Sequence, residues 1–423
     1  MNIALAGLGT VGCGVIRLLQ QNAAAITARL GQPLVIKAVS ARDKTKTRLC
    51  DLTGITWVED AMTLAHRPDI DVVVELIGGA EGTARQLAEA SLKAGKHFVT
   101  ANKALLAAHG VALARLAEEH HVFMGLEAAV AGGIPVIKTL REGMAGNSVT
   151  VVRGILNGTC NYILSRMRDA KLEFHVALQE AQQKGYAETD PAADIDGHDT
   201  ANKLALLAAL AFGSEPDLKT VYVEGIRGVT PLDLTFAEDL GCRIKLLGNA
   251  RLTAEGLEQR VGPSLVMETS PLAQMDGVLN AVLLRGDFVG DLMLAGQGAG
   301  AEPTASAVVA DLMDRARGLS VKTFGVPVAH LKKFPAVEAH EARYYLRLQV
   351  MDKPGVVADI SAILRDDAIS IESLLQRGKS ATQSVPVVMT THAAEWGAMR
   401  RAVEKIQQLP TIVEKPCLMR IED

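Results

Sequence analysis

An acidic loop that leads into an apolar helix is the segment of this chain whose residue types best suit chemistry. Five carboxylates stand at positions 188, 190, 194, 196 and 199, Lys203 follows them, and residues 204–210 are apolar. Carboxylates can hold a cationic group of a substrate, and a lysine removed from water can exchange a proton near neutral pH. The segment therefore predicts a pocket that binds a cationic group and transfers a proton.

Within that segment, Asp199 and Lys203 are four residues apart, so a helix would place them on one face, one turn apart. The usual interpretation of this spacing is a salt bridge on a solvated helix. The apolar residues after Lys203 favour a buried helix instead, and a buried ion pair needs a functional reason. On spacing alone, both interpretations stay open.

A second lysine stands where a ligand would bind if the strand before it belongs to a parallel sheet. Thr100-Ala101-Asn102-Lys103 follows the predicted strand His97–Thr100, and such sheets bind ligands at the carboxyl ends of their strands. Lys103 could polarise a carbonyl or move a proton there. The alternative is a surface lysine at the start of a helix.

A tight turn, Glu127–Pro135, follows another predicted strand and offers one carboxylate and several backbone carbonyls. Hard cations accept that type of ligand. On chemistry alone, a structural turn is the favoured interpretation of these residues, and an ion site is the alternative.

A glycine-rich loop near the start of the chain predicts a dinucleotide site. It directly follows the predicted strand Ile3–Ala6 and reads Gly7, Leu8, Gly9, Thr10, Val11, Gly12. In this pattern the first glycine permits a tight turn, the second lets backbone N–H groups approach a pyrophosphate, and the third lets helix and strand pack closely. The helix N-terminus adds partial positive charge. The alternative is a glycine-rich turn that binds nothing.

The tip of the second predicted strand bears on the choice of cofactor. Proteins that select NAD usually place an acidic residue here for the ribose hydroxyls. This chain has Ser40 at the tip, followed by Arg42 and Lys44, which favours a 2′-phosphate and hence NADP. Asp43 is the residue that argues for NAD, and a solvated loop is the alternative role for Arg42 and Lys44.

The elements around these motifs divide the chain into three parts and a connector. Residues 1–130 alternate strands and helices, which predicts an α/β domain with a Rossmann-like, doubly wound parallel sheet. Residues 131–320 mix longer helices with strands, which predicts an α+β domain, and residues 321–342 form the connector. Residues 343–423 predict the β-α-β-β-α-β order of a ferredoxin-like module.

The composition excludes several classes of function. The chain has 423 residues, 48% of them hydrophobic, and a formal net charge of −4. It can therefore bury large cores, and it lacks the basic field that attracts nucleic acid or acidic membranes. Its five cysteines form no Cys-x-x-Cys pair, which argues for a reducing compartment and against a zinc site. The sequence shows the pattern of neither a signal peptide nor a membrane span, so we expect a cytoplasmic protein.

Taken together, these motifs resemble those of the homoserine dehydrogenase family. The main resemblance runs over Ala181-Gln182-Gln183-Lys184-Gly185-Tyr186-Ala187-Glu188, Asp190-Pro191, Asp194-Ile195, Gly197, Asp199, Ala201 and Lys203. Residues 7–12, 100–103, 157–159 and 298–304 look like the same family. The tail, with its Asp-Lys-Pro-Gly turn at 352–355, resembles an ACT domain. Because the chain starts at the dinucleotide strand, we expect a monofunctional enzyme with no aspartate kinase domain in front.

The resemblance implies reversible, NAD(P)-dependent oxidation of L-homoserine to L-aspartate 4-semialdehyde, in threonine and methionine biosynthesis. It implies Lys203 as the general acid/base at the reacting oxygen and Lys103 as its partner beside substrate and nicotinamide. Glu188 and Asp199 would bind the polar groups of homoserine, with Asp194 nearby. The implied cofactor contacts are Gly7, Gly9, Thr10, Val11, Gly12, Arg42, Lys44, Thr100, Lys103, Gly185 and Gly300.

The resemblance also implies a monovalent cation, usually sodium, bound by a glutamate and backbone carbonyls. The matching residues are Glu127, Val130, Gly132 and Ile134. It further implies that residues 131–320 bind substrate, catalyse and dimerise, and that the chain forms a homodimer or homotetramer. The ACT domain would sense an amino acid such as threonine, and a dimerisation module without a ligand is the alternative.

Two rival functions remain beside this one. The first is a related dehydrogenase that acts on another amino-acid aldehyde. The second is a dinucleotide-sensing regulator without catalysis, although such a sensor would have no need of two lysines and an acidic loop.

Overall fold

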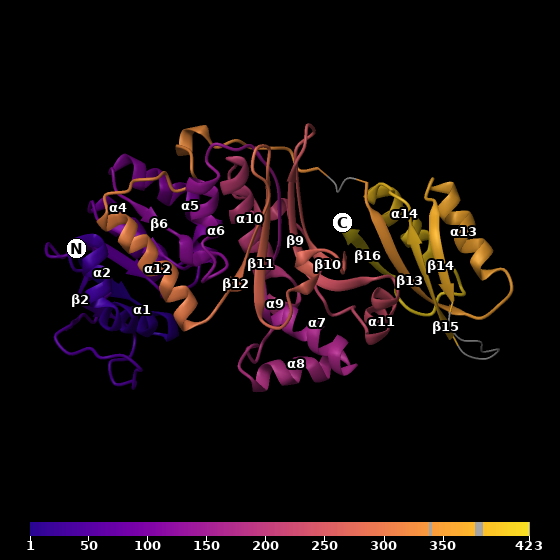
Figure 1. The fold of residues 1–423 in the computed structure, drawn as a ribbon, viewed down its shortest axis with the longest axis horizontal. Helices are drawn as coiled ribbons and strands as arrows, with labels where there is room; N and C mark the ends of the chain where they lie inside the picture. The colour runs from indigo at the N-terminus through magenta and orange to yellow at the C-terminus, as the bar shows by residue number, and fades with distance from the viewer. Residues whose placement is uncertain (338–340, 377–383, 423) are drawn as a thin grey trace.

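The computed structural model describes residues 1–337, 341–376 and 384–422. Three parts follow one another along the long axis of the molecule (Figure 1). The N-terminal strands and helices lie at one end, the C-terminal ones lie at the other, and the segment with the acidic loop lies between them. No helix of the described residues is both long and apolar enough to cross a membrane.

Parallel strands form the sheet of the N-terminal part, in the order β3-β2-β1-β4-β5-β6. The strands are β1 Asn2–Ala6, β2 Val35–Ser40, β3 Thr56–Trp57, β4 Val72–Glu75, β5 His97–Thr100 and β6 Met124–Gly125. The helices are α1 Thr10–Gln21, α2 Ala23–Leu30, α3 Met62–His66, α4 Thr83–Lys93 and α5 Lys103–Glu119. The strand order reverses between β1 and β4, where sheets of this class bind ligands. The predicted Rossmann-like doubly wound sheet is confirmed.

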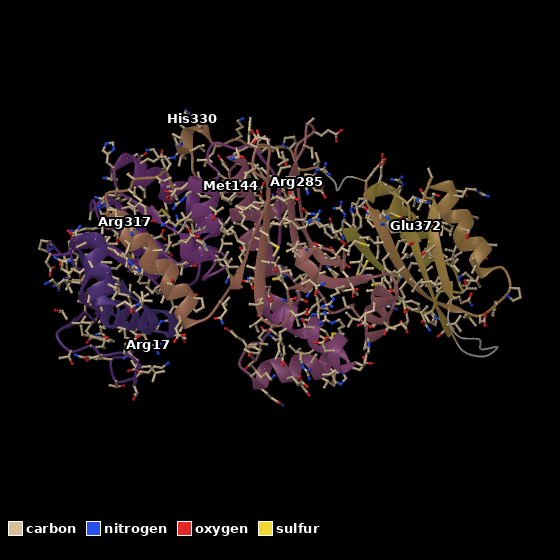
Figure 2. The ribbon with its side chains drawn as sticks, viewed as in Figure 1. Arg17, Met144, Arg285, Arg317, His330 and Glu372 are labelled. Atoms are coloured by element: carbon tan, nitrogen blue, oxygen red, sulfur yellow. The ribbon has the colours of Figure 1, made fainter. Side chains whose placement is uncertain are left out.

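A helix from much later in the chain completes this part. Helix α12 (Ala301–Ala316) packs on α1, and a Cβ at Gly14 would lie only 2.8 Å from the carbonyl oxygen of Ala301. Arg17 of α1, which Figure 2 labels, pairs with Glu302 of α12 at 2.8 Å across the same contact. The buried residues of α12 thus join the core of the N-terminal part, although the helix falls in the predicted domain 131–320.

A mixed sheet organises the middle part. Its strands run in the order β12-β11-β7-β9-β10, and β8 pairs in parallel with β10. They are β7 Val149–Ile155, β8 Tyr222–Val223, β9 Cys242–Leu252, β10 Leu257–Met267, β11 Leu279–Gly286 and β12 Gly290–Gln297. The helices are α6 Val136–Lys138, α7 Gly158–Ala170, α8 Phe174–Gln183, α9 Ala192–Ile195, α10 His198–Phe212 and α11 Pro231–Asp239. Short helical turns occur at η1 Glu127–Ala129, η2 Thr139–Gly143, η3 Leu218–Thr220, η4 Pro271–Gln274 and η5 Val328–His330.

Helix α10 carries the residues after the acidic loop and is buried almost all round. Every residue from Lys203 to Leu210 is buried, and the helix packs on β7 and β9. This confirms the buried helix predicted from the apolar run. It also means that Asp199 and Lys203 cannot be a pair on a solvated surface.

The C-terminal part follows its predicted element order and continues the middle sheet. Its elements are β13 Arg343–Met351, α13 Val356–Asp366, β14 Ile371–Gln376, β15 Ser384–Thr391, α14 Trp396–Gln407 and β16 Cys417–Glu422. The strand order β16-β13-β15-β14 is antiparallel, and β16 also pairs in parallel with β10. Buried ion pairs support the junction, Arg420 with Glu258 at 2.7 Å and Arg347 with Asp233 at 2.6 Å. Of the predicted connector, residues 338–340 lie outside the described residues.

Candidate active site

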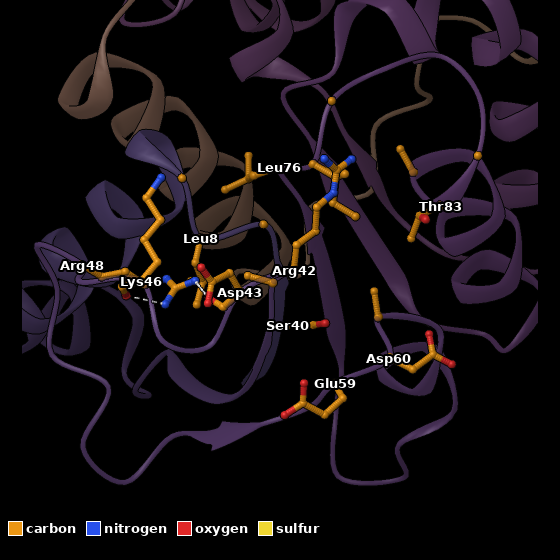
Figure 3. A pocket seen from close by; sticks show the side chains of 18 of the residues that line it. Leu8, Ser40, Arg42, Asp43, Lys46, Arg48, Glu59, Asp60, Leu76 and Thr83 are labelled. Atoms are coloured by element: carbon orange, nitrogen blue, oxygen red, sulfur yellow. Dashed lines mark hydrogen bonds between the residues drawn. The ribbon is translucent and has the colours of Figure 1, made fainter.

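A cavity of about 890 Å³ opens at the carboxyl ends of β1, β2 and β4, where the strand order reverses (Figure 3). Four loops line it, with Gly7–Gly9, Ser40–Asp43, Lys46, Arg48, Glu59–Ala61, Leu76–Gly78 and Glu81–Ala84. A cavity of this size at this point of a parallel sheet suits a dinucleotide.

The glycine-rich loop has the geometry that its pattern predicts. Gly7 has φ +102°, and a Cβ there would lie 2.4 Å from a carbonyl oxygen of the loop after β4, so only glycine fits. A Cβ at Gly12 would lie 2.1 Å from the carbonyl oxygen of Gly7. Gly9 caps α1, and no described atom lies within 4 Å of a Cβ built on it. The backbone at Gly9 is therefore open to a close ligand.

The loop after β2 directs basic side chains toward the cavity. Arg42, Lys46 and Arg48 line it, whereas Lys44 is not among its described lining residues. The carboxylate of Asp43 accepts hydrogen bonds from the N–H of Thr45 at 2.8 Å and from its hydroxyl at 2.7 Å. These bonds lower the pKa of Asp43. The acid that argued for NAD is therefore engaged in a local turn.

Asp199 joins the two lysines that the sequence singled out. Its Oδ1 lies 2.8 Å from Nζ of Lys103, and its Oδ2 lies 2.7 Å from Nζ of Lys203. Lys203 also donates to the carbonyl oxygen of Leu156 at 2.7 Å. Lys103 is the first residue of α5 and Lys203 lies on α10, so the bridge connects the N-terminal and middle parts of the chain. The i,i+4 salt bridge is present and buried, but it is one half of a three-residue cluster whose third member, Lys103, is partly exposed.

Asn157, which the sequence analysis named only within the family resemblance, is a further member of this cluster. Its Oδ1 accepts the N–H of Cys160 at 2.8 Å and so caps α7. Its Nδ2 donates to Asp194 at 2.7 Å and to Asp199 at 2.9 Å. One amide therefore fixes both carboxylates relative to each other.

A second network positions Lys103. Glu75 is fully buried at the end of β4, and its carboxylate accepts hydrogen bonds from the hydroxyl of Thr100 at 2.6 Å and the N–H of Ile77 at 2.6 Å. Asn102 donates to a carbonyl of the loop after β4 at 2.7 Å, and its Oδ1 caps α5. This network ties the loop that lines the cofactor cavity to the residue before Lys103. The sequence did not single out Glu75, because it lies inside an apolar strand.

The electrostatics of the cluster favour the ionised forms of Asp199 and Lys103. Burial alone would raise the pKa of Asp199, but the two lysines hold it well below its usual range. Burial opposes the charge of Lys103, but the nearby carboxylates, Asp199 foremost, outweigh this effect, and the pKa of Lys103 lies above its ordinary value. Burial raises the pKa of Asp194.

The other predicted contacts lie on loops around this cluster. Glu188 is exposed, and its charge contributes to the raised pKa of Lys103. Gly185 follows α8 with φ +73°, and Gly300 precedes α12 with φ +117°. Neither glycine is among the described residues that line the 890 Å³ cavity. Asp196 turns away from the lysines and pairs with the exposed Arg227.

The turn that begins at Glu127 buries its carboxylate. The residue is 1% exposed, and its carboxylate accepts the backbone N–H groups of Ile137 at 3.0 Å and Lys138 at 2.7 Å. The buried carboxylate of Asp311 lies close by and accepts the N–H of Glu127 at 2.9 Å. Burial and this second carboxylate raise the pKa of Glu127 to about 7. A cation beside Glu127 would therefore be stabilised.

The carbonyl groups of this turn fit a cation in part. Within the described residues, no backbone hydrogen bond reaches the carbonyl oxygens of Val130 and Gly132, whereas Ile134 accepts the N–H of Val136 at 2.7 Å. Nowhere in the described ranges do three or more His, Cys, Asp or Glu side chains come together as metal ligands. One carboxylate with carbonyls suits a hard cation of low charge rather than a transition metal.

Known proteins are similar to this chain over its whole length. A homoserine dehydrogenase from Neisseria gonorrhoeae is 44% identical over 429 residues, covering 99% of this chain and 98% of that protein. One from Pseudomonas aeruginosa is 41% identical, covering 100% and 99%. The crystal structure of a homoserine dehydrogenase from Thiobacillus denitrificans is 42% identical, covers 100% of this chain and 98% of that one, and superposes with a TM-score of 0.93.

The fold and the lysine cluster together define a dinucleotide-dependent oxidoreductase. The family model "Homoserine dehydrogenase, NAD binding domain" matches residues 7–127, and the model "Homoserine dehydrogenase" matches residues 135–313. The chain belongs to the homoserine dehydrogenase family. It is an NAD(P)-dependent enzyme whose substrates are L-homoserine and L-aspartate 4-semialdehyde. This excludes the two rival functions considered from the sequence.

Proposed function

We propose that Lys203 is the general acid/base of this reaction and that Lys103 is its partner beside the substrate. The observation that carries the proposal is the Asp199 bridge, which gathers both lysines at 2.8 and 2.7 Å. The bridge stands at the carboxyl edge of the parallel sheet, because Lys103 follows β5 closely. The dinucleotide, when bound, exchanges the hydride, and the protein must then supply or remove one proton.

The proton step follows from the hydrogen bonds of Lys203. An ammonium group has three N–H donors, and Leu156 and Asp199 accept two of them. The third can reach a substrate oxygen. In aldehyde reduction it donates its proton to the oxygen while hydride reaches the carbon. In homoserine oxidation the neutral amine takes the hydroxyl proton while the carbon loses hydride.

The carboxylates beside the lysines would bind the ammonium group of the substrate. We propose direct contacts from Glu188 and Asp194, and Asp199 adds negative charge while it holds the lysines. A carboxylate has about four acceptor positions, so Asp199 can serve both lysines and still contact a substrate. The side-chain amide of Asn157 donates to both Asp194 and Asp199 and so fixes the positions of the two carboxylates relative to each other.

Replacing Glu188 by Gln should therefore weaken substrate binding. A charge-assisted hydrogen bond is worth about 1.5–3 kcal/mol, so we expect the KM for homoserine to rise about tenfold or more. The KM for NADP should stay at the wild-type value. The matched control is Asp190→Asn, because Asp190 only caps the N–H of Ala192 in the same loop. Steady-state kinetics with each substrate varied in turn would test this, and a change confined to the KM for NADP would contradict it.

We propose NADP as the preferred cofactor, with NAD as the weaker one. Arg42, Lys46 and Arg48 line the cavity beside the tip of β2, where a 2′-phosphate would lie. Asp43 also lines the cavity, but its Oδ1 is engaged by the N–H and the hydroxyl of Thr45. The three cations beside it therefore favour a phosphate at this position.

Arg42→Ala should shift this preference. Loss of one charge-assisted contact to phosphate, about 1.5–3 kcal/mol, predicts a KM for NADP that is at least about tenfold higher. The KM for NAD should change little, because NAD has no 2′-phosphate. Lys44→Ala is the control, since Lys44 lies in the same loop but outside the described lining. Equal effects of Arg42→Ala on both cofactors would show that the arginine does not select the phosphate.

We also propose a sodium ion at the turn of Glu127, held by its carboxylate and the carbonyls of Val130, Gly132 and Ile134. The buried carboxylate supports this, as do the carbonyls of Val130 and Gly132, which accept no backbone hydrogen bond among the described residues. The ion would stiffen a turn that packs on the loop before α12, because a Cβ at Gly132 would lie 2.6 Å from the carbonyl oxygen of Gly298.

If the ion binds there, replacing NaCl by choline chloride at equal ionic strength should lower kcat several-fold. Glu127→Gln should remove that dependence on sodium while it leaves the fold intact by circular dichroism. Initial rates in the two salts measure the effect. Identical rates of the wild-type enzyme in both salts would rule the sodium site out.

For the C-terminal part we propose a ferredoxin-like ACT domain that senses an amino acid, with threonine as the expected effector. The strand order β16-β13-β15-β14 with two helices supports the fold. We propose domain boundaries at 130, 320 and 342, and a homodimer or homotetramer in the cytoplasm. Size-exclusion chromatography with light scattering would give the oligomeric state, and a monomer would contradict it.

A further inference from the structure

A separate cavity of about 360 Å³ lies where the middle sheet meets the C-terminal part. Its walls come from residues 219–222, from β10, from residues 336–337 and from α14. Lys219, Arg260 and Arg400 line it, and no carboxylate does so among the residues that the structure describes. The charge of the cavity therefore favours a ligand with an anionic group.

Arg260 is the buried cation of this cavity. Its side chain is 4% exposed, and its guanidinium lies 4.7 Å from the ring centre of Tyr222 and 4.2 Å from that of Trp396. In the described part of the chain, none of its three nitrogens finds a hydrogen-bond partner. The carboxylate of Glu224 is 3.7 Å away, too far for a hydrogen bond. Burying guanidinium N–H donors without acceptors costs free energy. A carboxylate is the group whose two oxygens match the paired donors, or fork, of a guanidinium.

Gln259 presents the complementary group. The hydroxyl of Thr220 donates its one hydrogen to the carbonyl oxygen of Asp217 at 2.9 Å, so in its contact with Gln259 this hydroxyl must accept the hydrogen bond. The atom of Gln259 that lies 3.0 Å from this hydroxyl is therefore Nε2. This leaves Oε1 of Gln259 as a buried acceptor without a donor in the described residues. An ammonium group would satisfy it.

We propose that this cavity binds a small α-amino acid, with its carboxylate on Arg260 and its ammonium on Oε1 of Gln259. A buried donor fork and a buried acceptor that line one small cavity are the two groups such a ligand requires. The nitrogens of Arg260 and Oε1 of Gln259 are all covered, so the ligand reaches them only when the surrounding side chains, the rings of Tyr222 and Trp396 among them, shift. Trp396 begins α14, so binding moves the C-terminal part relative to β10.

The segment that lines this cavity is also in contact with the acidic loop. Tyr222 begins the run 222–226, and the N–H of Ile226 donates to the carbonyl oxygen of Ile195 at 2.9 Å. A Cβ at Gly225 would lie 2.3 Å from the same oxygen, so the two segments are in close contact. Ile195 stands between Asp194 and the start of α10. A shift of Tyr222 is therefore transmitted to the carboxylates of the active site over a few residues, as coupling between two sites requires.

This inference rests on the proposed sensing of an amino acid and adds the location of its binding site. The direct test uses fluorescence, because the chain has two tryptophans, Trp57 and Trp396. In a Trp57→Phe background, L-threonine and then each other proteinogenic amino acid is titrated at millimolar concentration against the emission of Trp396. The comparison compound is 3-hydroxybutyrate, which has the carboxylate and hydroxyl of threonine but no ammonium.

We expect a saturable change of emission with an amino acid and little change with 3-hydroxybutyrate. Arg260→Lys, which keeps the charge but loses the fork, and Gln259→Leu, which removes the acceptor, should each abolish it. Gln274→Leu is the control, because Gln274 lies on η4, outside the lining of this cavity. Emission that no amino acid changes, confirmed by calorimetry, overturns the proposal, as does unchanged binding in both variants.

A kinetic experiment separates this site from the proposed function. The amino acid that binds should raise the KM for homoserine several-fold in the wild-type enzyme. Arg260→Lys and Gln259→Leu should remove this inhibition and leave the rate without effector unchanged. If the wild-type enzyme is inhibited and both variants are inhibited equally, sensing stands but its site lies elsewhere. If no amino acid affects the wild-type enzyme, the proposed sensing itself fails.

Discussion

Lys203→Ala will lower kcat by about 10²- to 10⁴-fold in both directions, the usual contribution of a positioned acid/base. The physical reason is local, because Lys203 keeps one donor for the substrate oxygen after it binds Leu156 and Asp199. The dinucleotide cavity lies on the other part of the chain, so the KM for NADP should stay close to that of the wild type. Steady-state rates of homoserine oxidation and of aldehyde-dependent NADPH consumption measure both values.

Two further variants show whether this loss is chemical. Lys203→Met keeps most of the buried stem and removes only the amine, so its kcat should fall as far as that of Lys203→Ala. Lys171→Ala removes an exposed lysine of the same part of the chain, which pairs with Glu238, and should leave kcat unchanged. A kcat for Lys203→Met near the wild-type value would assign the proton to another group.

The cofactor loop and the buried helix could be predicted because each depends on neighbours in the sequence. The glycines at 7, 9 and 12 act within one turn between a strand and its helix. The apolar run after Lys203 is enough to predict burial of α10.

The remaining features of the site depend on residues far apart in the chain. Asn157 contacts Asp194 and Asp199 from 37 and 42 residues away, and a turn signal in the sequence carries no information about them. Glu75 ends an apolar strand, so only the fold shows that it accepts a hydrogen bond from Thr100. The parallel pairing of β16 with β10 likewise follows from tertiary packing, since alternation identifies a strand but not its partner.

Asp199→Asn should reduce kcat/KM for homoserine by about 10- to 150-fold, because it removes charge-assisted hydrogen bonds worth about 1.5–3 kcal/mol. Asn keeps the shape and can still accept one hydrogen bond, so packing is largely preserved. It cannot hold both ammonium groups with a negative charge. Both lysines then lose the partner that fixes them, and kcat should fall together with substrate affinity.

The pH dependence separates this effect from a loss of packing. In the wild-type enzyme burial lowers the pKa of Lys103, and the charges of Asp199, Asp194 and Glu188 together raise it above its ordinary value. An amide is neutral, so the variant loses the strongest of these charges and the pKa of Lys103 falls. In the proposed reaction Lys103 lies beside the substrate, so its protonation state affects the rate in both directions. Aldehyde reduction needs a protonated lysine, so the alkaline limb of its pH profile should move to lower pH.

Homoserine oxidation needs a neutral lysine, so the acidic limb of its profile should also move to lower pH in Asp199→Asn. Rates of both directions across the pH range measure the two limbs. Asp196→Asn is the matched control, because Asp196 lies in the same loop but pairs with the exposed Arg227. If Asp199→Asn keeps the wild-type profile, or if Asp196→Asn shifts it equally, the shared aspartate does not set the protonation of the lysines. A shift confined to Asp199→Asn would mean that one carboxylate both gathers the lysines and sets the pH at which they exchange protons.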